Sequence, residues 1–196
     1  MQKVTGILLA GGKSRRMGTD KGFLLLQNMP LYTYSLAILE QFCSEIIISD
    51  NSDRYNKLGY KVVSDVFQNQ GPASGIYSAL LAAQFQHCIV LTVDLPFITK
   101  SVISQIYTAA GNSMAAAPVH PDGMVEPLCA FYHKDSFRFF YEALIDGNNK
   151  MLDILNSLNF TKVYLNHPTD QFNRRVFTNI NTPEDLAIAQ EVAKLQ

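Results

Sequence analysis

The sequence predicts an α/β protein of three layers, in which helices cover both faces of a mostly parallel central sheet. Short apolar runs alternate with longer segments whose apolar residues recur at helical spacing, which is the pattern of successive βαβ units. The first run, Lys3–Ala10, is apolar almost throughout, as expected for a parallel strand that is buried on both faces. These observations also favour right-handed crossover connections.

Up to residue 118 the two kinds of segment are clearly separated. Gly11 follows the first run, Pro30 lies near the first turn of the first helical segment, and Asp94 stops the fourth apolar run. We expect strands at 3–10, 45–49, 61–64, 88–93 and 114–118. We expect helices at 30–42, 72–86 and 100–110.

After residue 120 the alternation is looser. We expect strands at 124–132, 161–165 and 176–180, and helices at 134–145 and 150–158. A last helix should begin near Thr182, a good N-cap residue, because Pro183 then takes the first helical position and Glu184 and Asp185 lie near the positive helix end. No repeat or linker interrupts the chain, so we predict one domain over residues 1–196.

Composition excludes several classes of protein. The 196 residues carry 16 Lys and Arg against 17 Asp and Glu, whereas a general nucleic-acid or membrane-surface binder needs an excess of basic residues. Cys43, Cys88 and Cys129 fit neither a disulfide framework nor a paired-cysteine zinc site. The apolar run Ile7–Ala10 is too short for a signal-peptide core. We expect a cytoplasmic monomer with no nucleic-acid or membrane partner.

The loop after the first expected strand concentrates positive charge. Lys13, Arg15, Arg16 and Lys21 all lie between residues 11 and 21. Glycine lets backbone N–H groups approach an anion closely, and Arg and Lys bind phosphate groups. The segment therefore predicts a cradle for a triphosphate, and its position after the first strand disfavours the alternative of a solvated loop with incidental charges.

Spacing excludes two common phosphate-binding motifs. Gly12-Lys13-Ser14 imitates the end of a P-loop, but that motif needs a glycine at the position of Ile7. The dinucleotide motif G-x-G-x-x-G fails as well, because Lys13 stands where its second glycine would be. The loop is therefore a phosphate site of another kind.

The segment LLAGGKSRRMGTDKGFLL resembles the signature of the nucleotidyltransferase superfamily, written loosely as L-A-G-G-x-S-x-R-M-G-x-D-K. The Asp-Lys-Gly continuation is most similar to the molybdenum cofactor guanylyltransferases, the MobA family. Four later segments also resemble motifs of this family: 71–75 (GPASG), 93–96 (VDLP), 127–132 (PLCAFY) and 179–186 (NINTPEDL).

The resemblance implies a Rossmann-like nucleotidyltransferase fold and a particular reaction. Members of the family transfer GMP from GTP to molybdopterin-bound molybdenum cofactor, which forms a guanine dinucleotide cofactor and releases pyrophosphate. Residues from about 1 to 110 would form the nucleotide-binding half, and about 111 to 196 the acceptor-binding half. The implied partners are GTP, the molybdenum cofactor, and molybdoenzyme clients or their chaperones.

The resemblance also assigns the nucleotide site. The backbone of Leu9, Ala10 and Gly11 would lie near the base, and Gly12 would join them. The same site would be completed by side chains further along the chain, at Lys21, Asp65 and Asp94. A plainer interpretation of Asp65 is that of a loop residue after a strand.

Three of these positions would carry the chemistry. Arg16 occupies the signature arginine, and with Lys21 it would stabilise charge on the phosphates as pyrophosphate leaves. Asp94 is the candidate metal ligand, because a carboxylate beside phosphates is unfavourable unless a cation lies between them, and Mg²⁺ is held by few carboxylates plus phosphate oxygens. The alternative for Asp94 is a turn residue before Pro96.

Three asparagines are further candidates. The family tends to have Asn directly after the second strand, where this chain has Ser49, and we assign the nucleotide contact to Asn51, with an ordinary turn residue as the alternative. Asn179 and Asn181 alternate on an expected strand and would point together toward the acceptor; hydrogen bonding around the last helix is the alternative. Glu126 replaces an uncharged polar residue that relatives often have, so no contact is carried over to it.

Other functions also fit the residues. The nearest are a CTP-dependent molybdenum cofactor cytidylyltransferase and a nucleotidyltransferase for a sugar phosphate or phospholactate; a non-catalytic nucleotide-binding or cofactor-delivery protein belongs to another class. Gly11 favours GTP, because cytidylyl-transferring relatives tend to have alanine there and glycine leaves room for a purine. The four histidines share no ligand spacing, and we expect them to be structural or on the surface.

Overall fold

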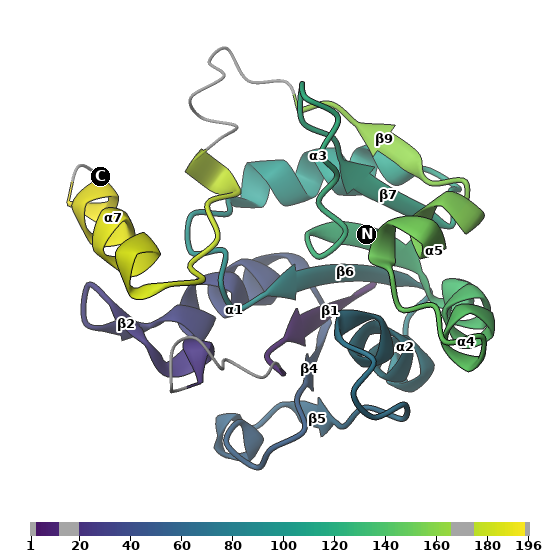
Figure 1. Cartoon of the computed structure of the whole chain (residues 1–196), viewed down its shortest axis with the longest axis horizontal. Coiled ribbons are helices and arrows are strands. Elements are labelled where there is room, and N and C mark those ends of the chain that lie inside the picture. Colours follow the sequence, from purple (N-terminus) through teal and green to yellow (C-terminus); the bar gives the residue numbers. More distant parts are fainter. Residues whose placement is uncertain (1–2, 12–19, 166–174, 195–196) are drawn as a thin grey trace.

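A seven-stranded sheet with the strand order β5-β4-β1-β6-β8-β7-β9 forms the centre of the molecule (Figure 1). The computed structural model describes residues 3–11, 20–165 and 175–194. Its strands are β1 (Val4–Leu9), β4 (Glu45–Ser49), β5 (Lys61–Val63), β6 (His87–Thr92), β7 (Ala115–Pro118), β8 (Ala130–His133) and β9 (Thr161–Val163). The helices are α1 (Leu31–Phe42), α2 (Pro72–Ala82), α3 (Lys100–Ala110), α4 (Phe137–Ile145), α5 (Met151–Ser157) and α7 (Pro183–Ala193).

Within the described ranges β8 runs antiparallel to both of its neighbours, β6 and β7, and the other pairings in this sheet are parallel. The structure thus confirms the predicted mostly parallel α/β fold. The register places the ends of three parallel strands level with one another, because Leu9 of β1 pairs with Ser49 of β4 on one side and with Thr92 of β6 on the other.

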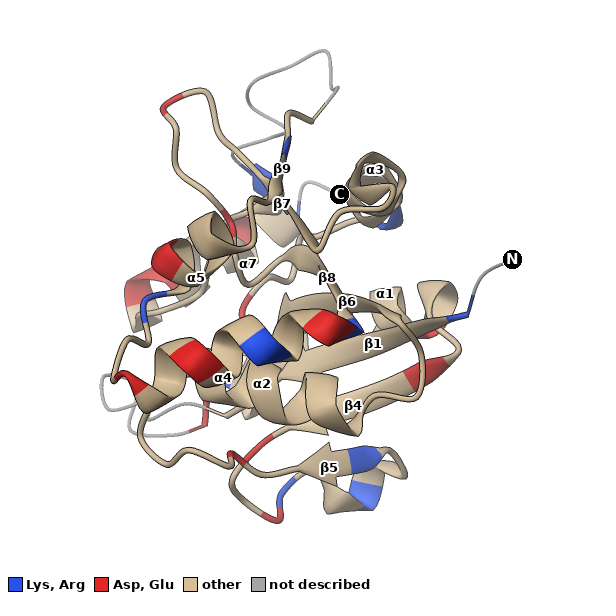
Figure 2. Ribbon diagram, turned by 90° about the vertical axis from the view of Figure 1, so that its right-hand side faces the viewer, with Lys and Arg blue, Asp and Glu red and all other residues tan. Residues whose placement is uncertain are grey.

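Helices cover both faces of the sheet, with α2, α4 and α5 on one side and α1 and α3 on the other (Figure 2). Leu8 of β1 packs in a core with Ile103 of α3, and Gly6, on the same face of the strand, lies against the end of α1. A Cβ on Gly6 would lie 3.0 Å from Cys43 Sγ, so the glycine lets α1 pack closely on the strand. Ile7 faces the opposite core, with α2.

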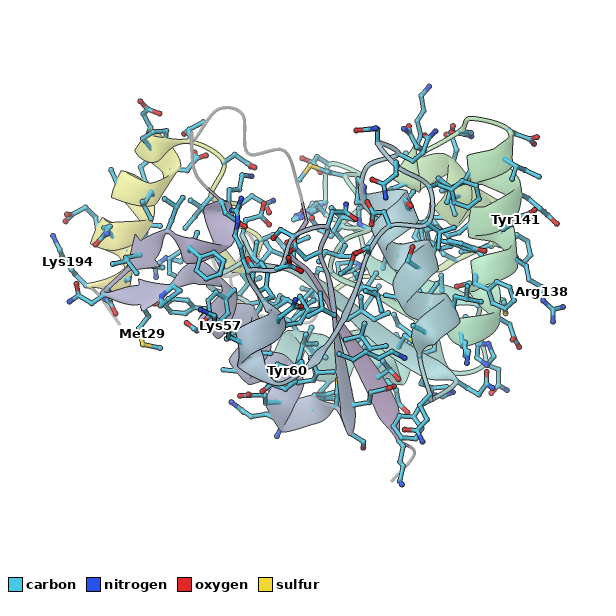
Figure 3. All side chains as sticks on the ribbon, turned by 90° about the horizontal axis from the view of Figure 1, so that it is seen from below. Met29, Lys57, Tyr60, Arg138, Tyr141 and Lys194 are labelled. Carbon is cyan, nitrogen blue, oxygen red and sulfur yellow. The ribbon has the colours of Figure 1, made fainter. Side chains whose placement is uncertain are left out.

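The last helix extends the fold beyond the sheet. A hairpin of β2 (Leu25–Leu26) and β3 (Met29–Pro30) receives α7, because Gln190 Nε2 donates to the Leu25 carbonyl at 3.2 Å. Figure 3 shows Met29 and Lys194 at this end of the molecule, and Arg138 and Tyr141 of α4 at the other. No helix within the described ranges is long and apolar enough to span a bilayer.

Two predicted strands are wrong in whole or in part. The strand expected at 124–132 begins only at Ala130, because residues before it form a hairpin turn with a single bridge between Val119 and Val125. The strand expected at 176–180 is absent from the described segment 175–194. Its apolar residues are buried without a ladder, and the Ile180 N–H donates to the Asp94 carbonyl at 3.1 Å instead of to a neighbouring strand. In addition, α2 ends at residue 82 rather than 86.

Candidate nucleotide site

A pocket of about 180 Å³ opens where β4, β1 and β6 end. Parallel α/β sheets bind ligands at this edge, beyond the carboxyl ends of their strands. The pocket is lined by Leu9, Ala10, Gly11, Ser49, Asp65, Gly71, Pro72, Gly75, Thr92, Val93, Asp94 and Leu128. The structure therefore brings together five residues predicted for the nucleotide site: Leu9, Ala10, Gly11, Asp65 and Asp94.

The backbone at the end of β1 is already hydrogen-bonded. The N–H groups of Ala10 and Gly11 both donate to the Ser49 carbonyl, at 3.0 and 2.9 Å. A nucleotide would therefore meet the carbonyl groups and the surface of this segment rather than its N–H groups. A Cβ added to Gly11 would be 3.6 Å from its nearest described neighbours, an ordinary contact, so the protein itself leaves room for a methyl group there.

Asp65 and Asn51 bind each other. Asn51 Nδ2 donates to Asp65 Oδ2 and the Asp65 N–H donates to Asn51 Oδ1, both at 2.8 Å. Burial raises the pKa of the Asp65 carboxyl above its ordinary value, and the hydrogen bond from Asn51 opposes that rise. Asn51 is absent from the pocket lining, whereas Ser49 belongs to it, so Asn51 positions Asp65 while Ser49 and Asp65 face the cavity.

Gly75 of α2 allows the helix to approach these residues. A Cβ at this position would lie 2.6 Å from Ser49 Oγ, and 3.4 and 3.5 Å from side-chain atoms of Leu9 and Asp65. The first distance is shorter than real Cβ contacts, so the hydroxyl of the buried Ser49 would have to move. In the GPASG segment, Gly75 therefore serves the pocket wall through its lack of a side chain, which lets α2 lie close to Ser49.

A junction of three segments lies beside Asp94. Lys21 follows the glycine-rich loop, and its Nζ lies 3.3 Å from Asp94 Oδ2 and donates to Asn181 Oδ1. The second Asp94 oxygen accepts the hydroxyl of Thr92. Asp94 and Asn181 follow Lys21 by 73 and 160 positions in the chain, yet both contact its ammonium group.

The start of α7 holds Asn181 in this junction. Asp185 Oδ2 accepts the N–H groups of Asn181 and Thr182, both at 2.8 Å, while Thr182 Oγ1 accepts the Asp185 N–H at 3.1 Å. These reciprocal bonds form a capping box and fix the backbone at the helix start. They lower the pKa of Asp185, with the bond from the Asn181 backbone as the largest cause.

The remaining predicted site residues are Gly12, Arg16 and Asn179. Gly12 and Arg16 lie outside the described residues. The strand that would have given Asn179 and Asn181 a common face is absent from the described segment 175–194, and Asn179 Nδ2 donates to the Phe177 carbonyl at 3.5 Å. The contact of both asparagines with the acceptor stays a prediction. Sequence reasoning missed Thr92, whose position two residues before Asp94 on a buried strand is the signal that could have revealed it.

The hairpin after β7 holds a hydrogen-bonded pair that sequence reasoning also missed. His120 Nε2 and Glu126 Oε1 are 2.9 Å apart, and both side chains are largely buried. The intervening Pro121-Asp122-Gly123 turn predicts a hairpin, and in its register, with Val119 bridged to Val125, His120 and Glu126 are diagonal neighbours on the two arms. Within the described ranges no cluster of three or more His, Cys, Asp or Glu side chains is arranged to hold a metal ion.

The fold and this pocket define a class: an α/β protein with a ligand site at the carboxyl edge of its sheet, where a lysine, an aspartate and an asparagine meet. A family profile described as the MobA-like NTP transferase domain matches residues 6–163. The chain belongs to this family, which confirms the resemblance seen in its motifs.

Relatives match over most of the chain. A protein of Pelotomaculum thermopropionicum named "Probable molybdenum cofactor guanylyltransferase" is 32% identical over 201 residues, which covers 99% of this chain and 95% of the relative. A protein of the same name from Clostridium perfringens is 35% identical over 153 residues, covering 78% and 77%. The crystal structure of molybdopterin-guanine dinucleotide biosynthesis protein A from Archaeoglobus fulgidus superposes with a TM-score of 0.82 at 26% identity, covering 98% and 100%.

Proposed function

We propose that the chain is a molybdenum cofactor guanylyltransferase, which transfers GMP from GTP to the terminal phosphate of molybdopterin carrying molybdenum. The names of the relatives support this reaction. The structural observation that carries it is the junction of Lys21, Asp94 and Asn181 at the edge of a pocket lined by the signature residues. This arrangement offers a cation, a metal-ligating carboxylate and an amide to a triphosphate.

The reaction needs positioning and charge stabilisation rather than a covalent nucleophile. An oxygen of the acceptor phosphate attacks the α-phosphorus of GTP, the bond from that phosphorus to the bridging oxygen breaks, and pyrophosphate leaves with the electron pair. Lys21 is held at the junction and would stabilise the charge that develops on the leaving group, as would Arg16 of the signature. The acceptor phosphate is already anionic, so it attacks without an activating base.

Mg²⁺ is the proposed metal, and Asp94 is its proposed ligand. The Lys21 ammonium lies between the carboxylate of Asp94 and the amide oxygen of Asn181, so the oxygens of this junction already surround a positive charge. Magnesium sites of nucleotide enzymes use one or two carboxylates and the phosphates of the substrate, which fits a single aspartate here. When bound, the ion would neutralise charge on the phosphates.

Asp65 is the proposed reader of the base. Its carboxylate faces the pocket, and burial raises its pKa, so ligand N–H groups would replace lost hydration. Guanine presents a ring N–H and an amino group on one edge, which match the two oxygens of a carboxylate. Cytosine offers only an amino group as donor, so this residue would favour GTP over CTP.

Pyrophosphate release tests the proposal, with GTP, CTP or ATP and with molybdenum cofactor, a sugar phosphate or phospholactate as acceptor. Release that requires both GTP and molybdenum cofactor is expected; release with another pair, or with none, would contradict the proposal. Asp94→Asn should lose most turnover at saturating Mg²⁺ and remain folded. The matched change at exposed Asp146, at the end of α4, should retain it; equal activity in both variants would remove Asp94 from the site.

A further inference from the structure

Glu126 is a second partly buried carboxylate, and it lies on the acceptor half of the chain. Its N–H donates to the Pro118 carbonyl at 3.0 Å, and its own carbonyl accepts the Cys129 N–H at 3.2 Å. These bonds tie the residue to the end of β7 on one side and to the turn before β8 on the other. The fold therefore fixes the backbone from which the carboxylate projects.

His120 orients this carboxylate. A carboxylate only accepts hydrogen bonds, so His120 Nε2 carries the proton in the 2.9 Å bond to Glu126 Oε1. The His120 ring is held in turn by the edge-to-face contact with Phe177, at 5.0 Å between centroids. The two side chains are 10% and 13% exposed, and no described residue donates to Glu126 Oε2. One oxygen of an oriented carboxylate thus remains for a ligand.

The pair lies beside the site of transfer. The charge of Asp94 is close enough to raise the pKa of Glu126, in addition to the larger effect of burial, whereas His120 opposes both. Leu128, two residues after Glu126, lines the nucleotide pocket. The segment that contains Phe177 continues to Ile180, whose N–H donates to the Asp94 carbonyl. A molecule bound at Glu126 would therefore lie next to the junction that faces the phosphates.

The chemistry of the pair selects among the parts of the acceptor. A phosphate group is disfavoured at this position, because the Glu126 carboxylate would repel it. A group with N–H donors is favoured, because a desolvated carboxylate gains most from donors that replace its lost water. The pterin ring of molybdopterin offers such a group, since its 2-amino and ring N–H donors lie on one edge, in the same arrangement as those of guanine.

We infer that Glu126, oriented by His120, binds the 2-amino-4-oxopyrimidine edge of the pterin in the acceptor. The inference rests on the proposed function and names the residue that recognises its second substrate. Asp65 would then read this donor pattern on guanine, and Glu126 would read the same pattern on the pterin. Glu126 is a binding residue, and His120 is a positioning residue that acts through it.

Fluorescence titration with two small probes tests the inference in the absence of GTP. The first probe is 6-hydroxymethylpterin, and the second is 6-hydroxymethyllumazine, in which a carbonyl replaces the 2-amino donor. The wild-type chain should prefer the pterin by about 10- to 100-fold, the size expected for a hydrogen bond to a charged group. Glu126→Gln should lose most of this preference, because its amide presents a donor to the pterin amino group.

Matched variants separate recognition from folding. Glu142→Gln, at an exposed position of α4, should keep the wild-type preference. His120→Ala should reduce the preference and His120→Gln should restore part of it, since glutamine also has a side-chain N–H that reaches the carboxylate. GTP affinity should be the same in the Glu126 variant and the wild type, which shows that the nucleotide half is intact.

Two results would overturn the inference. One is an unchanged preference for pterin in Glu126→Gln, and the other is the lack of any preference in the wild type. Failure of the proposed function is a separate result, since it would appear as wild-type protein that binds GTP but transfers no GMP to molybdenum cofactor, whatever the probes show.

Discussion

Gly75 gives the sharpest test of how the pocket is built. A methyl group at this position would lie 2.6 Å from Ser49 Oγ, so the hydroxyl of the buried Ser49 would have to shift. Overpacking of this kind costs about 1–3 kcal/mol. Alanine gains about 1 kcal/mol over glycine inside a helix. Gly75→Ala should therefore lower the free energy of unfolding by about 1 kcal/mol, near the middle of the resulting range.

The sign of the effect should reverse when the opposing oxygen is removed. In a Ser49→Ala background the nearest remaining atoms, from Leu9 and Asp65, are 3.4 and 3.5 Å away, which are ordinary contacts. Gly75→Ala should then raise the free energy of unfolding by about 0.5–1 kcal/mol through helix propensity alone. Urea denaturation of the four ligand-free proteins measures this cycle. Equal effects in both backgrounds would refute the proposed contact.

Three other changes have defined outcomes. Tyr55→Phe should raise the free energy of unfolding by about 1 kcal/mol, because the Tyr55 hydroxyl is buried and has no partner among the described residues; a loss of stability in urea would contradict this. Asp65→Asn should stabilise the protein at pH 7 and weaken GTP binding, because the folded state raises the pKa of Asp65 and the ionised carboxylate therefore lowers the free energy of unfolding as pH rises from the unfolded-state pKa through the folded one. The gain in stability should fade below about pH 4, where the carboxyl is protonated in both states. A gain that persists in acid would refute this explanation. Gly11→Ala should leave stability nearly unchanged and lower the ratio of GTP to CTP turnover, since its methyl group meets only ordinary contacts in the protein; an unchanged ratio would exclude Gly11 from base selection.

The sheet could be predicted from the sequence because its central strands are buried on both faces. Val4–Leu9 and His87–Thr92 read as continuous apolar runs, and a parallel sheet brings their carboxyl ends to one edge. Applied to the expected strands, that rule points to the end of the first strand, Asp65 and Asp94. The roles of these residues came from the resemblance of their motifs and not from periodicity.

The segment after residue 175 could not be predicted in this way. Val176, Phe177 and Ile180 are apolar and buried, and this pattern suits a strand as well as an irregular segment. A contact between residues far apart in the sequence favours the irregular segment, because the Ile180 N–H donates to the Asp94 carbonyl and not to a neighbouring strand. Similarly, the pairing of His120 with Glu126 depends on a hairpin register, which the spacing of apolar residues does not encode.

Formation of the dinucleotide product from GTP and molybdenum cofactor tests the central claim most directly. The purified wild-type chain should release one pyrophosphate for each guanine dinucleotide formed, with Mg²⁺ present, and should form little product with CTP. Binding of GTP without release of pyrophosphate in the presence of molybdenum cofactor, or equal turnover of CTP, would contradict the claim.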